Sequence, residues 1–247
     1  YFMSILLGIN LAAICIATAD PALEKYFTAN AAYNRKLYPV AATQFEGFLK
    51  VYSSHPKADL ALRGLALSNY ALKKYDVAIP SFAKLIAKQN LDKSINREKL
   101  IILQGKCMLQ TSQKDKAKEL FINEIKSLVN PSYKNSAIAL IIDISFGKAN
   151  WDDVIKWTPQ IKSLNPSAEQ LTRSLYQLGF AYYQKDLIPE AIDSLNSTPK
   201  EDISKKWKTR VSYLLGECYS KNNQLEDAES SLMIALEGIA DTEAGEC

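Results

Sequence analysis

The sequence predicts an all-α fold, a solenoid of about six helix–turn–helix repeats of ~37 residues each. Two observations predict it. A pattern of small and large apolar residues recurs along the chain with a nearly constant period, and an apolar stretch at helical spacing precedes each recurrence. The composition agrees, because nine Gly and nine Pro among 247 residues are too few for a loop-rich β protein.

The recurring pattern is a small residue followed four positions later by a large apolar one, as in Ala78 and Phe82. The small residue, which we call the anchor, stands at Ala41, Ala78, Ala117, Val154, Ala191 and Ala228. Successive anchors are 37, 39, 37, 37 and 37 residues apart. Chance would not hold that period over six units, so the chain is an array of repeats.

Upstream of each anchor lies a second apolar stretch. In the fifth unit it holds Leu175, Leu178, Gly179 and Tyr182. Residues three and four apart fall on one side of a helix. Each repeat is therefore predicted to be a helix A, a short turn and a helix B. Helix A glycines should let helix B approach closely, as the anchors do from the other side. They are Gly64, Gly105, Gly179 and Gly216.

Local signals refine the second helices. Asp76 and Asp152 stand where an N-cap would precede helix B. Pro159 falls well inside helix B of the fourth repeat, where it predicts a kink or an early end of the helix.

The repeat resembles the tetratricopeptide repeat family, which has Leu-Gly and Tyr in helix A and Ala followed by a large residue in helix B. The matching residues are Leu175, Leu178, Gly179, Tyr182, Ala191 and Leu195, and then Leu215, Gly216, Tyr219, Ala228, Leu232 and Ala235. The resemblance covers roughly residues 22–240. The sequence departs from the family at Ala32, where Tyr is expected, and at Val154. The resemblance implies a right-handed superhelix, and the longer period looks like the tetratricopeptide proteins of the bacterial envelope.

In this family, helix A side chains outside the core line a concave groove that binds proteins. The resemblance puts these residues there: Arg63, Tyr70, Lys106, Phe146, Arg173, Tyr176, Phe180, Tyr183, Arg210 and Tyr213, with Leu67, Lys99, Asp143 and Glu217 beside them. Tyr and Arg are enriched at binding hot spots, so the groove would suit an extended peptide that carries acidic groups. The alternative is that the rings pack between repeats and the arginines are simply solvated.

The N-terminus predicts export. Residues 5–19 are apolar apart from Asn10 and Thr18, and they end in a small-residue cleavage pattern before Asp20. We expect residues 1–19 to be a signal peptide whose start is missing, and residues 241–247 to be a truncated tail. The mature chain would then be periplasmic or extracellular, without a membrane span. Ile14 precedes Cys15, which argues against a lipid anchor.

The sequence favours an interaction scaffold over an enzyme. The single histidine, His55, reads as a solvated turn residue, and no catalytic, metal or cofactor motif is present. A net charge of +3 is too balanced to predict nucleic-acid binding. Cys107 and Cys218 occupy equivalent repeat positions and should be too far apart to form a disulfide. Two alternatives remain open: a non-catalytic part of an envelope enzyme whose catalytic domain lies beyond Cys247, and self-association through uncapped end repeats.

Overall fold

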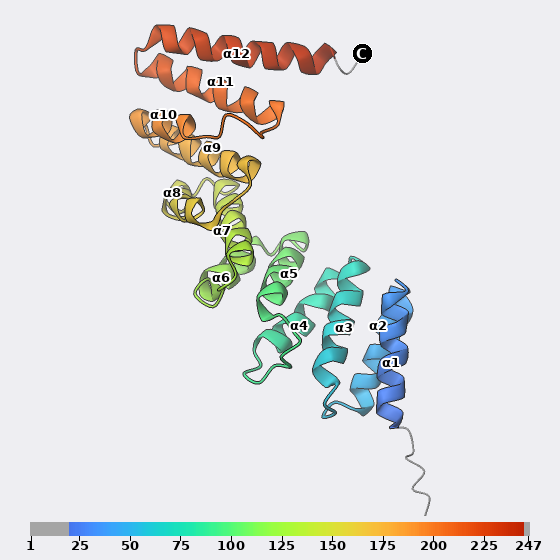
Figure 1. The fold of residues 1–247 in the computed structure, drawn as a ribbon. Helices are drawn as coiled ribbons and strands as arrows, with labels where there is room; N and C mark the ends of the chain where they lie inside the picture. Colours follow the sequence, from blue (N-terminus) through green and yellow to red (C-terminus); the bar gives the residue numbers. More distant parts are fainter. Residues whose placement is uncertain (1–19, 245–247) are drawn as a thin grey trace, which may run out of the picture. The chain divides into compact units, whose positions relative to one another are not determined.

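The computed structural model describes residues 20–244, which form twelve α-helices and two short 3₁₀ turns (Figure 1). The predicted leader, residues 1–19, lies outside the described residues. No strand occurs between residues 20 and 244, so the predicted all-α class is confirmed. The helices are α1 (Pro21–Asn34), α2 (Tyr38–Val51), α3 (Ala58–Ala71), α4 (Tyr75–Ile86), α5 (Arg97–Gln110), α6 (Lys114–Glu124), α7 (Pro131–Phe146), α8 (Trp151–Trp157), α9 (Ala168–Gln184), α10 (Ile188–Asn196), α11 (Lys205–Lys221) and α12 (Leu225–Ala244).

Odd-numbered helices are the A helices of the six repeats and even-numbered helices are the B helices. The turn from A to B contains one residue in the left-handed region, at Lys36, Lys73, Ser112, Ala149, Asp186 and Asn223, with φ between 53° and 61°. These six residues repeat with the same intervals as the anchors, 37, 39, 37, 37 and 37. The repeat period is therefore a property of the backbone as well as of the sequence.

A backbone hydrogen bond closes five of these six turns, all except the one at Lys73. The N–H after the left-handed residue donates to a carbonyl five residues earlier, for example Leu187 to Tyr182 at 3.0 Å and Gln224 to Tyr219 at 2.9 Å. This is the bond that ends many helices at a left-handed residue. Glycine usually occupies that position, but here none of the six is glycine.

The chain divides into two compact units, at residues 72 and 73. The described part of the first unit holds α1, α2 and α3, packed around the buried rings of Tyr26, Phe45 and Phe48. His55 lies in the turn between α2 and α3, as predicted, but it is only partly exposed to solvent. Its side chain is only 18% exposed, because the ring packs edge-on against Phe48 and bonds Asp20 at 3.1 Å.

Asp20 joins the start of the first unit to that histidine. The Ala22 N–H donates to the Asp20 carboxylate at 2.9 Å, which caps α1. This bond, and next the hydrogen bond with His55, lower the pKa of the Asp20 carboxyl.

The second unit contains α4 to α12. Each A helix contacts the next one along, α5 with α7, α7 with α9 and α9 with α11, whereas no B helix makes a comparable contact with the next B helix in residues 73–244. Because the A helices lie closer together than the B helices, they form the inner, concave side of this unit.

The anchors lie in the core, as a packing role requires. Five of them are 0% exposed and Ala228 is 5% exposed. The glycines face the large residue of the same repeat: a Cβ on Gly179 would meet Leu195 Cγ at 2.7 Å, and one on Gly216 would meet Leu232 Cγ at 2.5 Å. Gly64 behaves differently, because it faces Phe45 of the preceding repeat rather than its own helix B.

Two predictions about helix B were tested by the structure. Asp76 and Asp152 are not N-caps, since α4 and α8 begin one residue before them. The N-cap of α8 is Asn150, whose side chain accepts from the Asp153 N–H. The prediction for Pro159 is confirmed, because α8 has only seven residues and is followed by 3₁₀ turns at Thr158–Gln160 and Lys162–Leu164.

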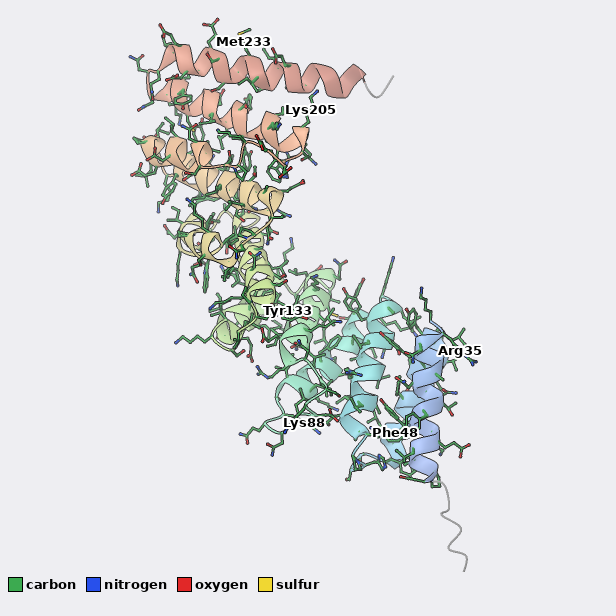
Figure 2. The ribbon with its side chains drawn as sticks, viewed as in Figure 1. Arg35, Phe48, Lys88, Tyr133, Lys205 and Met233 are labelled. Atoms are coloured by element: carbon green, nitrogen blue, oxygen red, sulfur yellow. The ribbon has the colours of Figure 1, made fainter. Side chains whose placement is uncertain are left out.

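The last helix carries an uncovered apolar side. Met233 points away from α11 (Figure 2), and its side chain is 56% exposed. Leu225 is 65% exposed, although the equivalent residue of the preceding repeat, Ile188, is 8% exposed beneath α11.

Among the described helices none is long and apolar enough to cross a membrane. Cys107 and Cys218 are both free, which confirms that they form no disulfide, and both are buried.

Candidate binding groove of the second unit

An open hollow of about 550 Å³ lies on the concave side of the second unit. Four successive A helices supply its lining, which comprises Lys106 of α5, Ser136, Ala139, Leu140 and Asp143 of α7, Glu169, Gln170, Arg173 and Ser174 of α9 with the preceding Ser167, and Trp207 of α11. The hollow therefore crosses the A helices and does not lie within one repeat.

The hollow exists because α7 presents small side chains to the concave side. Ser136 and Ala139 line it, and the residues one repeat later are Arg173 and Tyr176. Two small residues thus stand where the neighbouring repeat has two large ones. Both α7 and α9 are regular helices. The smaller side chains of α7 therefore leave open space on the surface, because the backbone does not shift to fill it.

A polar network forms one side of the hollow. The Arg173 guanidinium lies 2.9 Å from one oxygen of Asp143, and the Gln177 amide donates to the other oxygen at 2.9 Å. Burial raises the pKa of the Asp143 carboxyl, and these two partners only partly offset it. Asn135 donates to Gln170 at 2.9 Å. The network therefore fixes the orientation of Arg173 and Gln170.

The two ends of the hollow differ in chemistry. Lys106 lies at the α5 end, is exposed and has no ion-pair partner among the residues described. Trp207 lies at the α11 end, where its ring is 5.6 Å from that of Tyr176 and beneath the Arg210 guanidinium at 5.3 Å. One end is cationic and the other is aromatic.

An aromatic cluster adjoins this end. Phe180 is its centre, with ring centroids 5.3 Å from Phe146, 5.7 Å from Trp151, 6.4 Å from Tyr176 and 6.5 Å from Tyr183. Three of these residues, Tyr176, Phe180 and Tyr183, also pack against the buried core of α10 and α11. Burial raises the pKa of Tyr176, which the Arg210 charge opposes. The rings thus serve repeat packing while each keeps a partly exposed surface.

The structure brings together some of the residues predicted for the groove. Lys106 and Arg173 line the hollow, and Tyr176 and Arg210 contact its Trp207 wall. The others lie elsewhere: Phe146, Phe180 and Tyr183 in the aromatic cluster, Tyr213 on α11 with 54% exposure, and Arg63 and Tyr70 on α3 of the first unit.

Sequence reasoning missed Trp207, Ser136 and Ala139. Trp207 stands three residues before Arg210, so it shares that helix side and helical spacing alone could have found it. Ser136 and Ala139 are one period before Arg173 and Tyr176, and aligning the repeats would have revealed the substitution of small for large residues.

A family model, the tetratricopeptide repeat, matches residues 28–92. No curated protein matches the sequence. The fold resembles several solved structures. The C-terminal part of a tetratricopeptide repeat-containing protein from Cytophaga hutchinsonii shares 16% identity at a TM-score of 0.63, over 88% of this chain and 80% of that one. MamA shares 16% identity at a TM-score of 0.58, over 73% of this chain and 97% of that one.

A third solved structure is YrrB, described as a tetratricopeptide repeat protein with an unusual peptide-binding site. It shares 16% identity at a TM-score of 0.54, over 71% of this chain and 83% of YrrB. At such identities the likeness establishes the fold. The family match over residues 28–92, the all-helical fold and the backbone period of the repeats together support a tetratricopeptide repeat architecture.

Proposed function

We propose that this chain is a non-catalytic scaffold that binds an extended segment of another protein in the hollow of its second unit. The observation that carries the proposal is the lining: four successive A helices contribute to one open depression with polar and aromatic walls. An extended peptide is long and narrow, so it suits a site that crosses several helices. The peptide-binding site described for YrrB, which shares this fold, supports the same reading.

The hollow has the chemical features that peptide recognition requires. Serine hydroxyls and the Gln170 amide offer hydrogen bonds to a peptide backbone, while Trp207 and Tyr176 offer partly exposed rings to an apolar side chain. Both rings are held by neighbouring contacts, so little side-chain freedom is lost when a ligand packs on them.

The test is to fill the hollow. A random peptide library is panned against the purified chain, and the affinity of an enriched peptide is measured by fluorescence polarisation. Ala139→Trp places a large side chain on the floor of the hollow and should weaken binding by roughly tenfold or more. Ala87→Trp, at an exposed position just after α4, is the matched control and should bind like the wild type.

Circular dichroism and thermal melting of both variants establish that they are folded. If folded Ala139→Trp keeps wild-type affinity, the peptide binds outside the hollow and the proposed site is wrong. If panning enriches no peptide at all, the scaffold proposal itself fails.

Export belongs to the same proposal, and it rests on the apolar residues 5–19 and the small-residue pattern before Asp20. N-terminal sequencing of the mature protein should then begin at Asp20. A mature protein that retains residues 1–19 would contradict export by cleavage.

A further inference from the structure

We propose that one side of α12, here called the outer seam, docks an amphipathic helix of another protein, whose apolar stripe is flanked by Lys or Arg. The outer seam comprises Leu225, Glu229, Leu232 and Leu236. These residues are three and four positions apart, so they share one side of the helix. The seam is separate from the hollow, and the proposal does not depend on the proposed function.

Two leucines of the outer seam are far more exposed than apolar residues in the core. Leu225 is 65% exposed and Leu236 is 64% exposed, and Met233 beside them is 56% exposed (Figure 2). Leu232 is half-buried, because it also faces Gly216 of its own repeat. The seam spans about three helical turns, or ~17 Å. Contiguous exposed apolar side chains of this kind mark a surface that another molecule covers.

The joint between α10 and α11 shows what covers this side of a B helix elsewhere in the chain. One period before the outer seam, Ile188, Ile192 and Leu195 of α10 are buried in one core with apolar residues of α11. Those α11 residues are Val211, Leu214, Leu215 and Cys218, at the spacing i, i+3, i+4 and i+7. A helix with apolar side chains at that spacing is therefore the element that can cover the outer seam.

Glu229 makes the outer seam different from that joint. It occupies the position of Ile192, so a purely apolar partner surface would bury its carboxylate without compensation, which is unfavourable. The same position in α6 also holds a charge, Lys118, and its ammonium pairs with Asp153 of the next repeat. By the same logic, the helix that covers Glu229 has to bring a cation.

Further acids lie beside the seam. Glu226, Met233 and Glu237 are seven and four residues apart, so they form a row along one edge of it. The carboxylates of Glu226, Glu229 and Glu237 have no ion-pair partner within residues 20–244. Residues 225–244 include no Lys or Arg, although the whole chain has a net charge of +3. Charge complementarity therefore selects a basic helix as the occupant.

Two synthetic helices test the proposal. Both are as long as α11, carry Leu at i, i+3, i+4 and i+7, and are held helical by a side-chain cross-link. One has Lys on its flanks and the other has Glu. Fluorescence polarisation with the purified chain should give an affinity at least about tenfold higher for the basic probe. Equal binding of the two probes, or no binding of the basic probe, overturns the proposal.

Substitutions on α12 locate the binding surface. Leu236→Ser should weaken binding of the basic probe by roughly tenfold, because an exposed leucine that the probe covers is lost. Ile234→Ser is the matched control: Ile234 is 53% exposed, but it lies two residues from Leu236 and so on the other side of the helix. Both variants should keep the wild-type circular dichroism. A Leu236→Ser protein that binds the basic probe as the wild type does would refute the outer seam as the site.

A charge reversal tests the role of Glu229. Glu229→Lys should weaken the basic probe by roughly tenfold and strengthen the acidic probe. Glu190→Lys makes the same change of net charge at an exposed position of α10, and it should alter neither affinity appreciably. Equal effects of the two substitutions would mean that the probe responds only to the overall charge, and the proposal would be wrong.

Two measurements separate the outer seam from the hollow and from self-association. Ala139→Trp should bind the basic probe normally, and a loss of binding would place the probe in the hollow instead. Sedimentation velocity of the chain alone should show no association that Leu236→Ser abolishes; such an association would make a second copy the occupant and overturn the proposal. If peptide panning enriches nothing, the proposed function fails and the docking of a basic helix still stands or falls on its own probes.

Discussion

Phe121→Ala is expected to lower the free energy of unfolding by about 3–5 kcal/mol. The Phe121 ring is fully buried and lies over Gly105, in the space that a Cβ on that glycine would occupy. Gly105 has no side chain that could move into the cavity left by the ring. The loss of stability should therefore lie in the upper part of the range that is usual for large-to-small substitutions in a core. Urea denaturation followed by circular dichroism measures it.

Ile122→Ala on the same helix is the control, because Ile122 is 37% exposed and should cost less than about 1 kcal/mol. A Phe121→Ala protein as stable as that control would contradict the packing described here.

A substitution of Gly105, the residue that the Phe121 ring covers, makes a sharper test. Gly105→Ala should destabilise the wild type by roughly 1–3 kcal/mol, since the buried ring must move. In the Phe121→Ala background it should instead stabilise by about 1 kcal/mol, because the space is empty and Ala favours a helix.

Ala191→Trp is expected to cost roughly 1–3 kcal/mol or more by overpacking. Ala191 is 0% exposed, and its carbonyl oxygen lies 3.3 Å from the position of a Cβ on Gly179, so α9 and α10 leave no room for an indole. The melting temperature from circular dichroism should fall accordingly.

Glu190→Trp provides the matched control, because Glu190 is exposed on the same helix and should tolerate the ring. Equal melting temperatures for Ala191→Trp and the wild type would mean that the repeats are aligned incorrectly. Since repeats contact mainly their neighbours, the loss should be concentrated in the fifth and sixth repeats.

The sequence was sufficient for the helices and their packing. The anchor spacing that located Ala41 and Ala228 reappears in the buried residues and in the left-handed turns. Such periodic features are repeated six times, so each copy supports the others. The early end of α8 was also predictable, because Pro159 acts on its own backbone and needs no distant partner.

The hollow was much less predictable. Its floor is formed by Ser136 and Ala139, which attract no notice in a sequence because they matter for the volume they leave empty. Its walls come from residues that are about one repeat apart, so the pairing of Arg173 with Asp143 depends on tertiary packing. Gly64 failed as a prediction for the same reason, since spacing alone did not reveal which neighbouring helix it faces.

The contacts between neighbouring repeats also bear on how the chain folds. In the second unit, helices in contact are never more than a few elements apart along the chain. No long loop has to close before the first core contacts form, so the entropic barrier to nucleation is low. Folding can therefore begin at any pair of adjacent repeats and extend outward. The hollow is completed only when α5, α7, α9 and α11 have all docked.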